Sequence, residues 1–436
     1  MSQHDQNNNF IAPDGGWGWM ICIAVGISNM AVHSPMKQFG LIYKAKLAQL
    51  QITSTQITTI INTQYGVSSC IGLFNGPMFK RFSFRQVGFL GGVFVIIGVF
   101  SSAWCTTFVS YLLTYSTIYG FGMGLTMSSG SLALNTYFRK RRSIATGFST
   151  SITGFGSIVF PYLVVFLLNF YGYMGTVFIF SGITMHALVS AILYQPVQRH
   201  SKTSILIADE NTPLVHRHSY SYNEIQKSQS FLKKFISDLD LPLLKDFTFV
   251  NLLFGLTIII FGEVNFSALV PFILSDVGFD DGTISFAMSL MAIVDVLVRF
   301  TGPFVTQSFS FSDKFNFAIG VVIITAGRMM VAFSSSYTVI LCSFALVGFG
   351  KAFRTIYNPL IIAGYVPLKR YAAASGLQLV CTALFAFSFG PIIGGIKAKW
   401  GYSVTIHVIN GLSIIGLTSW GLEAVYWKYG DFRQNL

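Results

Sequence analysis

The segment Ser289-Leu-Met-Ala-Ile-Val-Asp295-Val-Leu-Val-Arg299-Phe300 carries two opposite charges within a hydrophobic stretch that is long enough to cross a bilayer. Asp295 and Arg299 are four residues apart, so a helix places them on one face. A charged side chain at mid-membrane costs roughly 2.5–3.5 kcal/mol even on the lenient insertion scale, so such residues face protein or water and find a partner. An acid that can take a proton, beside a base that can hold an anion, suggests the working part of an anion carrier.

The composition of the chain is that of a membrane protein. Hydrophobic residues make up 53% of the 436 positions and charged residues only 10%, whereas soluble domains carry about 25% charged residues. The twenty-residue criterion gives twelve spans, so we expect an all-α integral membrane protein with twelve transmembrane helices. The expected spans begin near Trp17, Thr55, Gln86, Phe108, Ser143, Tyr173, Phe247, Gly282, Phe315, Tyr337, Tyr371 and Ser403.

The net charge of +12 is concentrated in alternate loops. Basic residues follow the second, fourth and tenth spans and recur between the sixth and the seventh, whereas the opposite loops hold few. The positive-inside rule then predicts that both termini and the central loop are cytoplasmic. The basic runs also suit anionic lipid headgroups, which we prefer over nucleic acid as their partner.

Short sequence matches relate the two halves of the chain. Gly76-Pro77 recurs as Gly302-Pro303, and Gly120-Phe-Gly122 recurs as Gly348-Phe-Gly350. Three further matches keep the same order, and all five offsets lie between 226 and 230 residues: Phe82-Ser-Phe84 with Phe309-Ser-Phe311, Tyr137 with Tyr365, and Pro161 with Pro391. Because six is an even number of spans, both copies insert into the membrane with the same orientation. The pattern predicts the major facilitator fold, with two six-helix pseudo-repeats and a site between them near the midplane.

The repeat divides the chain into two bundles and three polar segments. The expected segments are a cytoplasmic N-terminal segment at 1–16, a first six-helix bundle at 17–195, a cytoplasmic linker at 196–246, a second six-helix bundle at 247–428 and a cytoplasmic tail at 429–436. The linker is rich in Ser, Lys and His and is not patterned like a helix for most of its length. Within it, Phe231-Leu-Lys-Lys-Phe-Ile236 is a candidate for a short interfacial helix.

Two motifs carry a family resemblance. Asp14-Gly15-Gly16-Trp17-Gly18-Trp19 precedes the first span, where Asp14 can cap a helix, the glycines permit a tight turn and the Trp side chains can anchor at the membrane interface. The second motif, Tyr137-Phe138-Arg139-Lys140-Arg141-Arg142 and a run of small residues, follows the fourth span. Together they resemble the two signatures of the monocarboxylate transporter family. The resemblance extends from about Pro13 to the last span.

This resemblance implies roles for three charged residues. The family's eighth-span Asp-x-x-x-Arg resembles Asp295 and Arg299, and a family Lys lies eighteen residues after the last Trp of the first motif, which is Lys37 in this chain. By resemblance, Arg299 holds the substrate carboxylate, Asp295 exchanges a proton, and Lys37 takes part from the other half. Guanidinium suits this role because it binds carboxylate through two parallel hydrogen bonds. The alternative is a structural ion pair that locks the eighth helix.

Four other residues within the spans are candidates: His33 as a further substrate-binding residue, and Glu263, Lys351 and Arg354 as secondary candidates. His33 lies one helical turn before Lys37, where it either lines the substrate path or satisfies a backbone carbonyl. Glu263 lies deep in the seventh span, and we expect it to pair with one of Arg328, Lys351 or Arg354. Structural pairing is the favoured role of Glu263, and a proton or cation site is the alternative. Lys351 and Arg354 are also candidate cavity residues.

Glycine positions add one departure from the family and exclude one function. Many relatives carry an acid near the end of the tenth span, where this chain has Gly364, so coupling through that acid is in question. Gly348-Phe-Gly-Lys351-Ala352 is not a phosphate-binding loop, because its first Gly and its Ser or Thr are missing. Gly390 and Gly394 are four apart, which indicates close helix packing. Without an ATP site, a nucleophile–base set or a metal-ligand cluster, we expect a gradient-driven carrier, not an enzyme, with no cofactor and no metal.

The resemblance implies proton-coupled symport of a small monocarboxylate by alternating access, in the plasma membrane. The expected partners are the small organic anion, the proton, membrane lipid and, as for some relatives, a single-span glycoprotein chaperone. Two alternatives stay open. One is a facilitative carrier of the same fold for aromatic amino acids, iodothyronines, creatine or carnitine. The other is a non-transporting membrane sensor or scaffold, against which the joint presence of Lys37, Asp295 and Arg299 argues.

Overall fold

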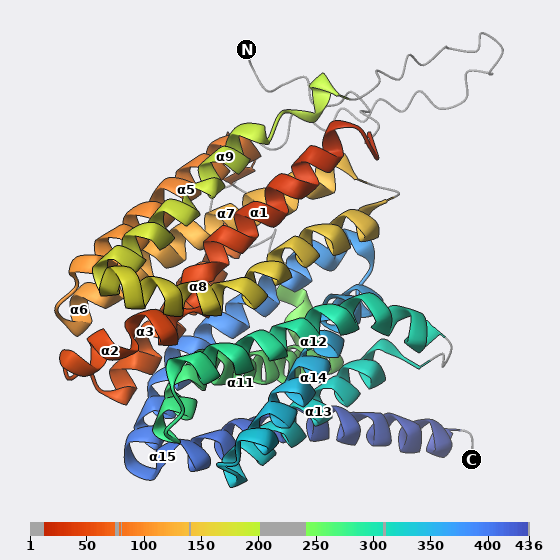
Figure 1. The fold of residues 1–436 in the computed structure, drawn as a ribbon. Helices are drawn as coiled ribbons and strands as arrows, with labels where there is room; N and C mark the ends of the chain where they lie inside the picture. The colour runs from red at the N-terminus through yellow and green to blue at the C-terminus, as the bar shows by residue number, and fades with distance from the viewer. Residues whose placement is uncertain are drawn as a thin grey trace.

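The computed structural model describes residues 13–74, 78–79, 81–138, 141–200, 241–307 and 311–434, and these fold as helices joined by short connections (Figure 1). The first half contains α1 (Trp17–Lys37), α2 (Phe39–Gln49), α3 (Ser54–Ile71), α5 (Phe84–Ser101), α6 (Phe108–Tyr111), the π-helix Leu112–Tyr119, α7 (Gly120–Tyr137), α8 (Arg142–Thr184) and α9 (His186–Leu193). The second half contains α11 (Phe247–Asp276), α12 (Asp281–Gln307), α13 (Asp313–Phe333), α14 (Tyr337–Tyr365) and α15 (Leu368–Gln434).

Eight segments in the described part of the chain are long and apolar enough to span a membrane. Two of them contain a glycine with positive φ, Gly172 in α8 (65°) and Gly401 in α15 (80°), and each is long enough for two spans divided there. Glycine adopts this backbone without the steric cost that other residues meet, so the chain turns at these points. With those two breaks, and with α3 and the α6–α7 segment, the described helices are consistent with the twelve expected spans.

Local sequence signals explain where several helices begin. Thr53 and Gln56 form a capping box at α3, and Ser83 and Gln86 form another at α5. Asp246 caps α11, because its Oδ1 accepts a hydrogen bond from the Thr248 backbone N–H (3.0 Å). All the expected span starts lie within three residues of a helix start or of one of the two glycine breaks.

The helices form two groups, one from each half of the chain, which lie side by side (Figure 1). The main helix pairs that join the groups are α8 with α12 and α3 with the first part of α15, and α11 also contacts α2 and α3. The second pair is closely packed, as the glycine spacing predicts: a Cβ at Gly390 would lie 2.4 Å from the Cβ of Asn62, and one at Gly394 would lie 2.2 Å from Oγ1 of Thr58. The core that sits between the groups therefore draws residues from both halves.

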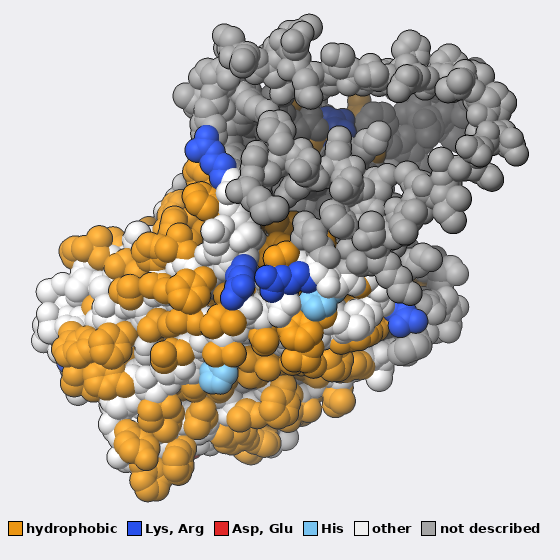
Figure 2. Space-filling model, turned by 90° about the horizontal axis from the view of Figure 1, so that it is seen from above, with side chains coloured by type: hydrophobic (Ala, Val, Ile, Leu, Met, Phe, Trp, Pro, Cys, Tyr) orange, Lys and Arg blue, Asp and Glu red, His pale blue; other side chains and the backbone are white. Residues whose placement is uncertain are grey.

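The outer surface of the first half is mainly hydrophobic (Figure 2). Phe170 in the first half and Phe333 in the second are each more than two-thirds exposed, an arrangement that suits lipid contact. Most of the expected linker, residues 201–240 with the candidate helix Phe231–Ile236, lies outside the described residues, as do residues 1–12 of the expected N-terminal segment and the last two of the tail.

Candidate functional site

The two sequence motifs meet at one end of the first half. The backbone N–H of Asp14 donates to the Tyr137 carbonyl (3.1 Å), and Oδ1 of Asp14 accepts from the Arg141 backbone N–H (3.2 Å). The expectation that Asp14 caps α1 is wrong, because the N-cap is Gly16 and no side chain caps it. Asp14 lies two residues before that cap, and its carboxylate reaches the connection between α7 and α8 instead.

The aromatic residues of the first motif pack on protein groups. Trp17 donates Nε1–H to the Leu193 carbonyl (3.3 Å) and stacks on His200, while Trp19 contacts the edge of Phe138. At about 1.5 Å per residue, α1 carries the chain roughly 30 Å from this end to Lys37. The motifs therefore hold the N-terminal end of α1 in place, far from Lys37 at its C-terminal end.

Near its other end, α1 contains Pro35, two residues before Lys37. Pro35 has no N–H, so the Ala31 carbonyl loses its helical partner and accepts from Oγ of Ser34 instead (2.8 Å). The Val32 carbonyl accepts from the Tyr119 hydroxyl (2.8 Å), whose side chain comes from the π-helical segment. α1 ends at Lys37, and α2 begins two residues later.

Lys37 reaches toward α8 and remains accessible. Its Nζ donates to Oγ of Ser157 (2.8 Å), and its side chain is exposed. His33, one turn earlier, is half-buried, and its Nδ1 lies 2.7 Å from the Asn29 carbonyl. His33 therefore contacts a backbone carbonyl, which is one of the two roles expected for it from the sequence. The substrate-path role stays a prediction.

Asp295 and Arg299 form the pair that their spacing indicates. Nε of Arg299 donates to Oδ1 of Asp295 and Nη2 donates to Oδ2, each at 2.7 Å. The Asp295 side chain is 10% exposed and the Arg299 side chain 24%. The same helix touches the first half, because Ser289 donates Oγ–H to the Ile158 carbonyl (2.8 Å). The pair thus lies on the helix that faces the other bundle.

Glu263 has the basic partners expected for it. Nη2 of Arg354 donates to Oε1 of Glu263 (2.9 Å), Nε of Arg354 pairs with Oε2, and Nζ of Lys351 lies 3.8 Å from Oε1. Nη2 of Arg354 also reaches Oγ1 of Thr355 (3.1 Å). Glu263 lies on α11 and both bases lie on α14, so this cluster joins two helices of the second half.

Arg328 on α13 is the deepest base of the group. It is 1% exposed, and its guanidinium lies 4.9 Å above the Phe266 ring. Its Nε and Nη2 have no hydrogen-bond acceptor among the described residues. Stacking on an aromatic face offsets part of the cost of burying a guanidinium, but it satisfies no N–H group.

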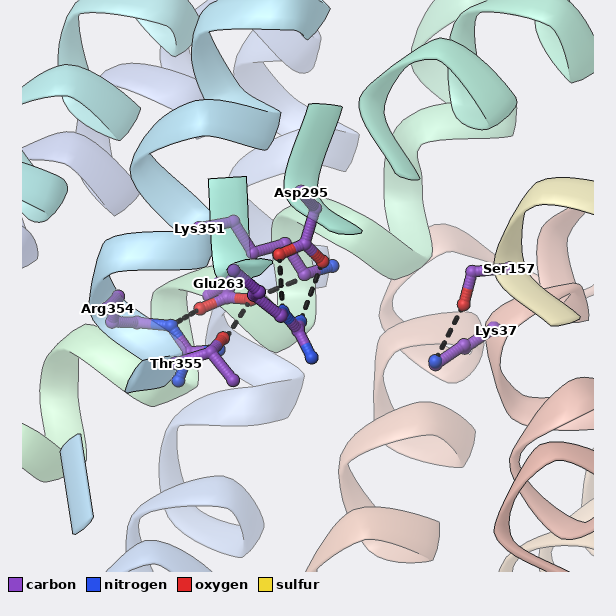
Figure 3. A network of polar contacts seen from close by, with 8 residues as sticks. Lys37, Ser157, Glu263, Asp295, Lys351, Arg354 and Thr355 are labelled. Carbon is purple, nitrogen blue, oxygen red and sulfur yellow. Dashed lines mark hydrogen bonds and ion pairs between the residues drawn. The ribbon is translucent and has the colours of Figure 1, made fainter. Parts of the chain in front are cut away.

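These charges surround one region between the bundles. Figure 3 shows Asp295, Lys351, Glu263 and Arg354 gathered on the second half, with Lys37 on the first half across from them. The charges of Lys351, Arg299, Asp295 and Glu263 all act on Lys37. We call this set the central charge cluster. Its members are Lys37, Glu263, Asp295, Arg299, Arg328, Lys351 and Arg354.

Sequence reasoning missed two polar residues beside the cluster. Asn62 on α3 and Asn265 on α11 exchange side-chain hydrogen bonds (2.7 and 3.0 Å), which join the two halves in the interior. Tyr65, one turn after Asn62, lies close enough to Arg354 and Glu263 to interact electrostatically with both. The available signal was Asn265, an amide on the apolar helix α11, since such a group is costly unless it is paired.

The second half has a contact at its own end that resembles the Asp14–Tyr137 junction. Tyr365, at the end of α14, donates to the carboxylate of the α11 cap Asp246. Burial, followed by this hydrogen bond, raises the pKa of Tyr365 to about 12, so its hydroxyl stays a donor at neutral pH. At Gly364, the family's acid position, a Cβ would meet open space.

Comparison with known proteins supports the family and the fold. Residues 18–237 match the Major Facilitator Superfamily. The chain is 24% identical to monocarboxylate transporter 2 of Rattus norvegicus over 93% of this chain and 82% of the relative, and 23% identical to monocarboxylate transporter 4 of Gallus gallus over 92% and 81%. A solved POT family transporter in complex with 5-aminolevulinic acid covers 94% of this chain and 97% of its own, with a TM-score of 0.71 and 13% identity.

Proposed function

Because this chain belongs to the Major Facilitator Superfamily, we propose that it is a secondary transporter that moves a small monocarboxylate together with a proton by alternating access. The observation that carries the proposal is the two-bond Asp295–Arg299 pair, which lies on the helix that contacts the opposite bundle. The similarity to monocarboxylate transporters supports an organic anion as the cargo.

The pair offers a direct way to couple a proton to an anion. In the observed state, the Asp295 carboxylate occupies two of the five N–H groups of Arg299. Protonation removes the negative charge and one acceptor, so the guanidinium is released to bind a substrate carboxylate with the same two-bond geometry. Lys37, exposed and across from the pair, supplies a second positive charge from the first half.

Contacts between the halves at the α2 end support one closed face. Nζ of Lys44 lies 2.6 Å from Oδ1 of Asp281 and 3.3 Å from Oγ of Ser275. Gly40 lies directly against Pro271, where an added Cβ would come within 2.7 Å. In the positive-inside orientation this end is extracellular, so we interpret the structure as closed to the outside.

Linking α2 to α12 across this face is expected to stop transport. The variant with Lys44→Cys and Asp281→Cys should transport before treatment, because an exposed ion pair contributes only about 0.2–1 kcal/mol. A bifunctional thiol reagent with a reducible linker should lower its uptake at least tenfold, since the halves can no longer separate there. Reduction should restore the rate.

Each single-cysteine variant, treated in the same way, is the control for the native cysteines. Full uptake by the cross-linked double-cysteine variant, with the cross-link verified by mass spectrometry, would contradict the idea that the two halves separate at this position.

Uptake of labelled pyruvate into proteoliposomes that hold an internal pH dye tests the proposed function. We expect uptake to acidify the interior and an inward proton gradient to stimulate it. Uptake of pyruvate without acidification would support the facilitative alternative. Specific binding of pyruvate without translocation would support the sensor or scaffold.

A further inference from the structure

The central charge cluster holds more positive than negative groups. Among the described residues it contains five basic side chains and two carboxylates. A substrate with one carboxylate, bound at Arg299 while Asp295 is protonated, leaves three of the five positive charges without an opposite charge, because Glu263 and the substrate are then the two negative groups. Such charges are costly inside a membrane unless they are paired, so the surplus indicates a ligand with more than one negative group.

The surplus lies mainly around Glu263. This carboxylate makes its close contacts with Arg354, and the charges of Lys351, Arg328 and Arg299 act on it as well. Nζ of Lys351 is 3.8 Å from the nearest Glu263 oxygen, which is beyond hydrogen-bond distance, and 21% of its side chain is accessible. Lys351 can therefore take another acceptor without breaking the Glu263–Arg354 pair.

Arg328 adds an independent sign that acceptors are lacking at this place. The guanidinium is almost fully buried, and two of its N–H-bearing nitrogens have no acceptor in the described part of the chain. A buried charged donor without an acceptor is destabilising. Additional negative charge beside Glu263 would offset the positive potential that Arg328 creates.

We propose that Lys351 and Arg354 form a second anion subsite beside the monocarboxylate site, so that a dicarboxylate whose two ends reach Arg299 and Lys351 also binds, and binds more tightly than a monocarboxylate. This inference rests on the proposed function, because it assumes that Arg299 holds the first carboxylate. The two subsites share one feature, an Arg paired with an acid. Lys351 lies beside the second pair, whereas Lys37 lies across from the first pair on the other half of the chain.

Binding of succinate and butyrate to the purified full-length protein, measured by isothermal titration calorimetry, tests the proposal. The two probes have the same number of carbons and differ in the second carboxylate. We expect the dissociation constant of succinate to be at least tenfold lower than that of butyrate. Lys351→Gln should remove most of this preference, whereas Lys351→Arg should retain it, because the positive charge stays in place.

Lys314→Gln, the same change at an exposed residue in the first turn of α13, is the matched control and should retain the wild-type preference. Equal constants for the two probes, or a preference that survives Lys351→Gln, would overturn the second subsite. Binding of butyrate alone would overturn it too, yet leave the proposed monocarboxylate function standing. If neither probe bound, the second subsite would fall, and the pyruvate uptake described above would decide the proposed function separately.

Discussion

Replacing Arg299 by Ala is expected to reduce substrate uptake by roughly 100-fold or more while the protein still reaches the membrane. Charge-assisted hydrogen bonds contribute about 1.5–3 kcal/mol each, and Arg299 is the group proposed to make two of them with the substrate. A loss of about 2.7 kcal/mol corresponds to a factor of about 100 in affinity. Arg299→Lys keeps the positive charge but loses the planar guanidinium that makes two parallel hydrogen bonds. Its uptake should therefore lie between that of the wild type and that of Arg299→Ala.

Folding must be separated from binding in this test. Removing Arg299 alone leaves the buried Asp295 carboxylate without its partner, and breaking a buried pair costs about 3–5 kcal/mol. The double variant Asp295→Asn with Arg299→Gln removes both charges, so it should be folded and still inactive. Arg85→Ala, a change at an exposed arginine in the first turn of α5, is the control. Undiminished uptake in Arg299→Ala would reject the role assigned to this residue.

Asp295→Asn is expected to separate transport from the proton gradient. The amide resembles the protonated acid in shape, but it neither gains nor loses a proton at physiological pH. With one proton per substrate, an inward gradient of one pH unit supports about tenfold accumulation. The wild-type protein should approach this ratio in proteoliposomes, whereas the variant should equilibrate its substrate at a ratio near one.

Two measurements make the result decisive. Counterflow, in which labelled substrate exchanges for unlabelled substrate without a gradient, should persist in Asp295→Asn, because binding and rocking do not need the titrating group. Asp313→Asn, which removes an acid from the first turn of α13, should accumulate substrate like the wild type. Proton-driven accumulation of normal size in Asp295→Asn would exclude Asp295 as the proton site.

The positions of the helices followed from local signals. Apolar length, capping boxes such as Thr53 with Gln56, and glycines near Tyr173 and Ser403 act over a few residues, so they can be read without knowing the fold. The Asp295–Arg299 pair was accessible for the same reason, because a helix brings residues four apart together. Asp14 shows the limit of local reasoning. Its side chain is suited to capping a helix, but it accepts a hydrogen bond in the α7–α8 connection, more than a hundred residues away.

The sequence by itself determined a membrane protein of two related halves, the approximate start of each span, and a pair of opposite charges on one helical face. These properties depend on hydrophobicity and on the fixed geometry of a helix. Only the tertiary structure decided that Arg354 is the close partner of Glu263, that Asn62 meets Asn265, and that Arg328 has unmatched donors. Those contacts join residues on different helices, and their choice depends on how the helices pack in three dimensions.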